Sequence, residues 1–363
     1  MTNFSELTTL RVGGPAGHLV EATTRSEVID TALRFWADPV DWLVLGGGSN
    51  LVVADAGFGG NVLRVAHRGI DRATEGVGRI RVEAGEQWDA VVAFAVEQGL
   101  AGIEALSGIP GTAGAGPIQN IGAYGQQVSD TLVSIDFLDF ESGEVLTLAA
   151  EDLDLGYRTS AVKGGRLGVV LSLELALHDE NGQSAPIAYE QLAKALGVAL
   201  GERAPLVAVR DAVLALRASK GMVWDPADPD SISAGSFFTN PIVSETFART
   251  LPSDAPRYPT EPEEAPRILP LGSEIPAPAG ASSGEYLVKL SAAWLIEHAG
   301  IARGFALPGS GAAISAKHTL AIVNRGTATA ADVVQLAGYV QTRVLSEFGV
   351  ALQPEPMLVG IQL

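Results

Sequence analysis

Apolar residues recur at helical spacing in three segments of the chain. From Ser26 to Ala37 they form one stripe, which predicts an amphipathic helix with Ser26 at its N-cap. A second stripe starts at Trp88 and stops at Gly99, a residue type that favours the left-handed conformation just past a helix end. A third helix is predicted over 332–348. The apolar positions of this last helix are Val333, Leu336, Val340, Val344 and Phe348.

Three shorter apolar runs predict buried strands. They cover Trp42–Leu45, Leu167–Leu177 and Leu320–Asn324. Helical and extended patterns are therefore mixed along the whole chain. This mixture indicates an α+β or α/β architecture.

Two segments lack such periodicity. Between Gly108 and Gly125 the density of glycine and proline predicts an irregular loop without a regular element. Residues 251–283 are rich in Pro, Glu, Ala and Gly, which predicts a surface insertion that is a mobile loop for most of its length. Arg257–Pro259 is a candidate exception within it.

Composition narrows the class of protein. With 363 residues, 47% of them hydrophobic and 18% charged, the chain is long and apolar enough for two or three packed domains. The formal net charge of −18 disfavours nucleic acid and anionic membranes as partners, so an anionic substrate needs local Lys and Arg to hold it. The chain has no cysteine, which excludes disulfides, thiol nucleophiles and Cys-ligated metals.

The start of the chain has neither the basic residues nor the apolar core of a secretory signal. No apolar run reaches the length of a membrane-spanning helix. We therefore expect a cytoplasmic protein. The five histidines show no metal-ligand spacing such as H-E-x-x-H, so we expect no catalytic metal.

Two glycine-rich stretches are candidates for phosphate binding. The strand predicted at 42–45 runs directly into Gly46–Leu51, and a second stretch covers Ser107–Gly114. Consecutive N–H groups without Cβ obstruction form nests that bind anions. Either stretch could instead be only a tight turn, and neither matches a Rossmann or P-loop motif.

Three polar residues are candidates for chemistry, although each type is more often inert when isolated. Arg158 follows a tyrosine, Ser236 lies beside two phenylalanines, and Glu355 stands between two prolines that stiffen its backbone. No G-x-S-x-G motif surrounds Ser236, so a serine hydrolase is not indicated. From the residues alone, the type of reaction stays open.

Taken together, eight blocks of the sequence resemble the UDP-N-acetylenolpyruvoylglucosamine reductase family, also called UDP-N-acetylmuramate dehydrogenases. Members of this family act second in the committed route to peptidoglycan precursors. The matching blocks occur in the family's order and extend over almost the whole chain. They are 8–15, 45–51, 104–125, 156–160, 234–241, 288–295, 317–324 and 352–360.

The resemblance implies an α+β fold of the PCMH or vanillyl-alcohol-oxidase type, with a two-subdomain FAD-binding unit followed by an α+β substrate-binding domain. It places the subdomains at 1–68 and 69–219 and the substrate domain at 220–349, with 350–363 packing back on the first subdomain. It also implies a cytoplasmic, monomeric oxidoreductase that binds a UDP-sugar and takes electrons from NADPH. Nucleic acid and membrane insertion play no part in this function.

The resemblance implies that FAD is bound by both glycine-rich stretches and by the residues that follow the second one. No His lies in these loops and Cys is absent, so a non-covalent cofactor is expected. The implied cofactor-binding residues are Gly46, Gly47, Gly48, Ser49, Asn50, Leu51, Ser107, Gly108, Ile109, Pro110, Gly111, Gly114, Ala115, Gln119, Asn120, Gly122, Ala123 and Tyr124.

Arg158, Ser236 and Glu355 fall on the family's catalytic positions. Hydride addition to C3 of the enolpyruvyl group would build negative charge on C2 and its carboxylate, which the Arg158 fork can stabilise. Ser236 would protonate C2. Glu355 could assist only if protonated, or through Arg158 or water, because a carboxylate repels an enolate.

The UDP-sugar requires cations and aromatic faces. Tyr189 resembles the tyrosine loop that closes over substrate in one of the family's two structural types. In that type Tyr258 belongs to the same region, but here the stretch from Tyr258 to Lys289 is longer than the family leads us to expect. At His318 the family varies between His and Gln. The implied substrate-binding residues are Tyr157, Tyr189, Lys220, Asn240, Tyr258, Lys289 and His318.

Two other functions stay open from the sequence. Other oxidases and dehydrogenases of this flavin fold often attach FAD through a His or Cys, and their substrate domains should lack the Gly-Ser-Phe-Phe-x-Asn-Pro sequence at 235–241. A non-catalytic nucleotide-binding module would keep the glycine loops. The presence of Arg158, Ser236 and Glu355 together counts against such a module.

Overall fold

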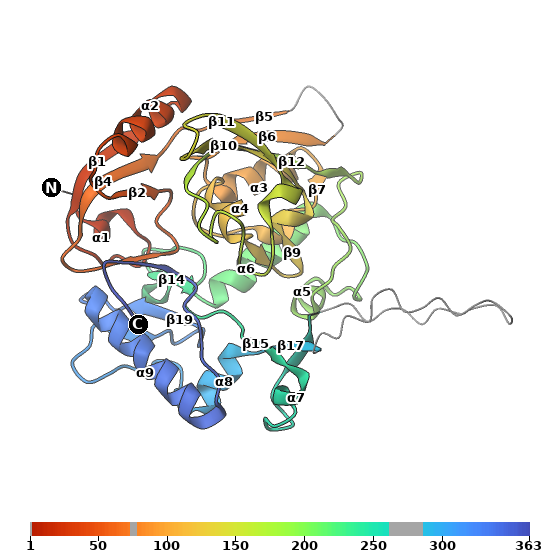
Figure 1. Ribbon diagram of the computed structural model, residues 1–363. Coiled ribbons are helices and arrows are strands. Elements are labelled where there is room, and N and C mark those ends of the chain that lie inside the picture. Colours follow the sequence, from red (N-terminus) through yellow and green to blue (C-terminus); the bar gives the residue numbers. More distant parts are fainter. Residues whose placement is uncertain (1, 73–77, 261–285) are drawn as a thin grey trace, which may run out of the picture.

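The computed structural model describes residues 2–72, 78–260 and 286–363, and its elements form three groups along the chain (Figure 1). The predicted insertion at 251–283 lies outside the described residues from position 261 onward. Its candidate exception is ordered, because Arg257–Pro259 form the short strand β16.

The first group is built on a parallel three-stranded sheet with the order β1-β4-β2, against which α2 packs (Figure 1). The predicted strand at 42–45 is confirmed as β2. The elements of this group are α1 (Phe4–Leu7), β1 (Ala16–Ala22), α2 (Arg25–Trp36), β2 (Trp42–Leu45), β3 (Leu51–Val53) and β4 (Phe58–Val65).

The predicted N-cap of α2 is wrong by two residues. Thr24, not Ser26, accepts the N–H of Glu27, and the Glu27 carboxylate accepts the N–H of Thr24 in return. This reciprocal capping box satisfies two N–H groups that the helix itself cannot bond. Ser26 has no acidic partner three residues later and lies inside the first turn.

The second group is built on a five-stranded antiparallel sheet with the order β11-β10-β12-β6-β5. Its larger elements are β5 (Ile70–Arg72), β6 (Arg79–Glu83), α3 (Trp88–Glu97), β10 (Leu132–Asp139), β11 (Val145–Ala149), β12 (Gly168–Ala176), α5 (Glu190–Leu196) and α6 (Leu206–Ser219). The shorter ones are β7 (Leu100–Ala101), α4 (Ala115–Gln119), β8 (Gly122–Ala123), β9 (Gln126–Gln127) and β13 (His178–Asp179).

The structure confirms most of the predicted pattern in this group. Helix α3 ends at Glu97, and Gly99 follows it with a φ of +73°. The predicted strand at 167–177 is β12. The irregular loop predicted between Gly108 and Gly125 is partly wrong, because it contains α4 and β8. Pro117 fits α4 since it occupies the first turn, where no intrahelical N–H bond is lost.

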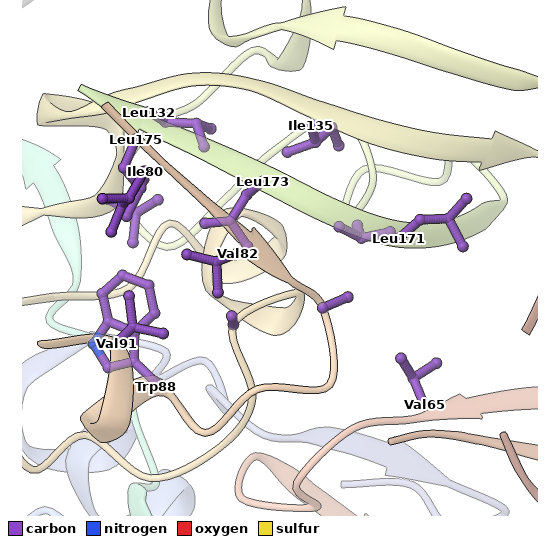
Figure 2. Packing of buried hydrophobic residues seen from close by; sticks show 14 of the residues in the cluster. Val65, Ile80, Val82, Trp88, Val91, Leu132, Ile135, Leu171, Leu173 and Leu175 are labelled. Atoms are coloured by element: carbon purple, nitrogen blue, oxygen red, sulfur yellow. The ribbon is translucent and has the colours of Figure 1, made fainter. Parts of the chain in front are cut away.

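The largest hydrophobic core unites the first two groups (Figure 2). Trp88 and Val91 of α3 pack with the inward-facing residues of β6, β10 and β12. Val65, at the end of β4, joins the same cluster from the first sheet. The two sheets therefore share one core.

The third group contains two small sheets, with the orders β14-β19-β18 and β15-β17-β16. The predicted strand at 320–324 is confirmed as β19. Of the predicted face of α9, four residues are buried and Phe348 is partly buried against the same core. The elements are β14 (Ser233–Ser236), β15 (Ile242–Ser244), α7 (Glu245–Ala248), β16 (Arg257–Pro259), β17 (Leu287–Leu290), α8 (Ala292–His298), β18 (Ala312–Ile314), β19 (Ala321–Asn324), α9 (Ala330–Phe348) and β20 (Met357–Val359).

Two contacts connect the third group to the first. Strand β20 runs parallel to β3, with Leu358 opposite Val52. Asp55, just after β3, accepts the N–H groups of Ala330 and Ala331 at 2.8 and 3.0 Å, at the start of α9. In the part of the chain that the structure describes, no helix is long and apolar enough to cross a membrane.

The Asp55 contact gives a test of this connection. Asp55→Ala leaves two N–H groups of the first turn of α9 without their acceptor, and we expect a loss of about 1–2 kcal/mol in the free energy of unfolding. Glu141→Ala, at an exposed position, should change it by less than about 0.5 kcal/mol. Denaturant unfolding of both variants measures the difference, and equal stabilities would show that this cap is dispensable.

Candidate active site

The two glycine-rich stretches lie against each other. The Ser49 hydroxyl donates to the carbonyl of Pro110 at 3.1 Å. A Cβ added to Gly47 would lie 2.8 Å from the Cα of Gly111, a distance that real Cβ atoms do not reach. Gly111 itself has a φ of +113°. Only glycine allows the two backbones to approach this closely and form one cradle.

The first stretch offers the cradle's N–H groups. Among the described residues, nothing accepts a hydrogen bond from the N–H groups of 46–50. The second stretch offers fewer, because Gly108 N–H donates to Asp89 at 2.6 Å and Gly114 N–H donates to Ala84. Free, adjacent N–H groups in a cradle without side chains suit an anionic diphosphate, so the residues fit the pyrophosphate of FAD.

Arg158 is held in a strained backbone conformation beside the residues that follow the second stretch. Its φ is +55°, a left-handed value that is uncommon for a residue with a side chain. Its Nη1 and Nη2 donate to the carbonyls of Asn120 and Gly122 at 3.2 and 2.7 Å. Each Nη carries a second N–H, which leaves the guanidinium able to bind a further acceptor.

Glu355 comes to Arg158 from the opposite end of the chain. Its Oε1 lies 3.2 Å from Arg158 Nε and accepts a hydrogen bond from Gln119 Nε2 at 3.1 Å. Its backbone N–H donates to the carbonyl of Phe237 at 2.9 Å. Phe237 directly follows Ser236, the last residue of β14. The structure therefore brings all three predicted catalytic residues into one region.

Tyr157, Asn240 and Lys289 form a second cluster next to this pair. Lys289 Nζ lies 5.0 Å from the centroid of the Tyr157 ring, and the Tyr157 hydroxyl accepts the N–H of Asn240 at 3.4 Å. Burial raises the pKa of Tyr157, so its phenol stays protonated at neutral pH. Burial, and then the nearby Arg158, lower the pKa of Lys289.

Tyr124, Tyr189, Lys220 and His318 line a pocket of about 160 Å³. The two tyrosine rings meet edge to face with their centroids 5.5 Å apart. Lys220 Nζ lies 5.5 Å from the Tyr124 ring centroid and donates to the Gln191 side chain at 2.8 Å. The structure thus also brings together four residues that sequence resemblance assigned to FAD or to substrate.

Tyr258 lies between these two clusters. It is opposite Lys289 in the antiparallel pairing of β16 with β17. Burial, and then the neighbouring Tyr258 and Glu190, raise the pKa of Tyr189. Tyr258 is therefore beside Lys289 in the sheet and near enough to Tyr189 to affect its pKa, although it is not among the residues that line the pocket.

The pocket concentrates positive charge in an acidic protein. Burial, and then the charges of Lys220, Arg303 and Arg217, together lower the pKa of His318 to about 4, so the imidazole is neutral at pH 7. Burial also lowers the pKa of Lys220 and of Arg217. Cations that destabilise one another in a pocket make a favourable site for an anion.

Two residues that the sequence analysis missed take part in these clusters. Arg217 lines the pocket, is 7% exposed, and its Nε finds no hydrogen-bond partner among the described residues. Its position three residues before Lys220 on α6 is a helical spacing that could have indicated it. Lys163 contacts both Gln119 and the Arg158 backbone, and no local pattern indicated this contact. Within the described ranges, no group of three or more potential metal ligands is assembled.

Two family models match the chain. The model described as "FAD binding domain" matches residues 16–149, and the model described as "UDP-N-acetylenolpyruvoylglucosamine reductase, C-terminal domain" matches residues 227–359. The first range contains both glycine-rich stretches. The second contains Ser236, Lys289, His318 and Glu355.

Curated relatives named UDP-N-acetylenolpyruvoylglucosamine reductase match over almost their full length. The protein from Leifsonia xyli subsp. xyli is 60% identical, with 99% of this chain and 98% of the relative covered. The protein from Mycobacterium tuberculosis is 47% identical, with 99% and 95% covered. A crystal structure of the reductase from Thermus caldophilus matches with a TM-score of 0.63 and 25% identity, over 99% of this chain and 97% of the other.

The cradle predicts a specific effect of a single methyl group. Gly47→Ala forces the two glycine-rich backbones apart, and the strain of about 1–3 kcal/mol should raise the dissociation constant for FAD roughly ten- to a hundredfold. Gly59→Ala is the control, because an added Cβ there meets nothing within 4 Å. Titration of each apoprotein with FAD measures the affinity. If both variants bind FAD like the unchanged protein, the cradle is not the cofactor site.

The depressed pKa of His318 predicts a pH dependence of stability. Below its ordinary pKa of 6.5 the unfolded chain takes up a proton that folded His318 refuses until about pH 4, so stability falls as the pH drops through this window. His318→Gln removes this proton uptake. Between about pH 7 and pH 5 the variant should lose roughly 1 kcal/mol less than the unchanged protein. Denaturant unfolding at both pH values measures this, and parallel losses would exclude a buried neutral imidazole.

Proposed function

The chain belongs to the UDP-N-acetylenolpyruvoylglucosamine reductase family, and from this membership we propose that it reduces the enolpyruvyl group of UDP-N-acetylenolpyruvoylglucosamine with electrons from NADPH. It is an FAD-dependent oxidoreductase. The proposed product is UDP-N-acetylmuramate, a precursor of peptidoglycan. The observation that carries the proposal is the meeting of Arg158, Glu355 and the segment around Ser236 beside the glycine cradle.

In this proposal the UDP-sugar lies along the cationic pocket. Lys220 and Arg217 face its phosphates, and neutral His318 donates one hydrogen bond to them. Lys289, above the Tyr157 ring, holds the sugar end near Arg158. Tyr189 and Tyr258 cover the pocket from its exposed side, where both rings remain accessible.

FAD, when bound in the cradle, supplies a hydride to C3 of the enolpyruvyl group. The N–H groups that Arg158 does not use for Asn120 and Gly122 bind the carboxylate, where negative charge develops. The guanidinium is already oriented by those two carbonyls, so little reorganisation is needed when the charge appears.

Ser236 supplies the proton to C2 in this proposal. Its hydroxyl makes no hydrogen bond with the described residues, and it is half-buried at the end of β14. A serine hydroxyl is a weak acid, so its contribution depends on placement beside a short-lived carbanion. The division into 1–68, 69–219 and 220–349, with 350–363 returning to the first part, belongs to the same proposal. The pairing of β20 with β3 supports it.

Ser236→Ala tests the proposed proton donor. Reduction of bound flavin by NADPH needs no proton at C2 and should stay nearly unchanged. Reoxidation by the enolpyruvyl sugar should slow by at least about a hundredfold, the lower range for a positioned acid. Stopped-flow absorbance separates the two half-reactions.

The control for this variant is Ser346→Ala, at an exposed position of α9 far along the chain from the site. It should leave both half-reactions unchanged. Equal slowing of both half-reactions in Ser236→Ala would point to a structural role. If the unchanged protein is reduced by NADPH but the enolpyruvyl sugar does not reoxidise it, the proposed substrate is wrong.

A further inference from the structure

The Gln119 side chain lies between a cation and a carboxylate. Lys163 Nζ donates to Gln119 Oε1 at 2.8 Å and to the carbonyl of Arg158 at 2.9 Å. On its other side, Gln119 Nε2 donates to Glu355 Oε1 at 3.1 Å. Lys163 is otherwise exposed, so its ammonium reaches inward to make these contacts. A chain of hydrogen bonds therefore runs from Lys163 through Gln119 to Glu355.

The chemistry of the lysine fixes the direction of this chain. An ammonium group has only donors, so Gln119 must present its oxygen to Lys163. The amide nitrogen then necessarily faces Glu355. A flipped amide would place NH₂ against the ammonium and a carbonyl oxygen against the carboxylate, which is unfavourable at both ends.

This direction decides how Glu355 can carry a proton. Its Oε1 accepts a hydrogen bond from Gln119 Nε2 at 3.1 Å and lies 3.2 Å from Arg158 Nε, close enough for an ion pair but without hydrogen-bond geometry. A proton on Oε1 would face the Gln119 donor and the Arg158 cation instead of an acceptor. Among the described residues, none makes a hydrogen bond with Oε2. The neutral acid is thus stable only with its proton on Oε2.

We propose that Lys163 is a positioning residue that, through Gln119, keeps Glu355 Oε1 an acceptor and confines the proton of the neutral acid to Oε2. When Glu355 carries a proton, its Oε2–H is then the donor available to the enolpyruvyl carboxylate as charge develops there. The inference rests on the proposed function, because it gives Glu355 its role in that reaction. No bond is made or broken in this step, and the proton stays with Glu355.

Lys163→Met keeps the length of the side chain but removes every donor. Gln119 can then flip, and we expect reoxidation of the flavin by the enolpyruvyl sugar to slow about ten- to a hundredfold, since small misplacements of a reacting group cost up to roughly that much. KM for the sugar, flavin reduction by NADPH and flavin content should change little. Lys163→Arg, which retains donors, should recover part of the rate. Lys194→Met, at an exposed position of α5, is the matched control.

A double-variant comparison distinguishes an effect that passes from Lys163 through Gln119 to Glu355, here called the relay, from a separate effect of Lys163. If Lys163 acts through Glu355, Lys163→Met should slow reoxidation little further once Glu355→Ala is present. The relay would be overturned if the two substitutions slowed reoxidation by factors that multiply in the double variant. It would also be overturned if Lys163→Met slowed flavin reduction and reoxidation equally, or if it left the reoxidation rate unchanged.

Thermal unfolding gives a test that needs no catalysis. In the relay, the loss of Tm in the double variant Lys163→Met, Glu355→Ala should be smaller than the sum of the two single losses, because the groups share one network. Additive losses would overturn the relay. If the unchanged enzyme fails to reduce the enolpyruvyl sugar, the proposed function is wrong, and this unfolding comparison alone decides whether the relay exists.

Discussion

The ion pair between Arg158 and Glu355 depends on the return of the chain's last residues to β3, in the first group of elements. β20 pairs with β3, and the Met357 N–H donates to the carbonyl of Asn50. The Asn50 side chain in turn donates to the carbonyl of Glu355 at 3.3 Å. Asn50 belongs to the first glycine-rich stretch. The first glycine-rich stretch therefore holds the backbone around the candidate acid by two hydrogen bonds.

The same arrangement concentrates cations in a protein with a net charge of −18. Burial lowers the pKa of Arg217, Lys220 and Lys289, which means that folding places these charges where water solvates them poorly. Proteins retain such poorly solvated charges at functional sites, and the unfavourable free energy of burying them falls when an opposite charge binds. An anionic ligand should consequently stabilise the folded protein as well as occupy the pocket.

Local patterns predicted much of the fold. The stripe of α9 and the Gly99 stop of α3 follow from helical periodicity and glycine chemistry, which act within a few residues. The wrong N-cap of α2 also has a local cause. Thr24 caps the helix in place of Ser26 because only Thr24 has a glutamate, Glu27, three residues later. In the site, resemblance indicated Arg158 and Glu355, but their contact joins residues nearly 200 positions apart. The Lys163–Gln119–Glu355 chain depends on that tertiary contact, so no spacing along the sequence reveals it.

The long stretch before Lys289 is compatible with a place for Tyr258 in the site. β16 and β17 are antiparallel, with Pro259 opposite Val288 and Tyr258 opposite Lys289. The chain therefore leaves this sheet and re-enters it at neighbouring positions. The entropic cost of closing such a loop grows only slowly with its length. Because the register of the pair fixes Tyr258 beside Lys289, added residues between the strands do not separate these two side chains.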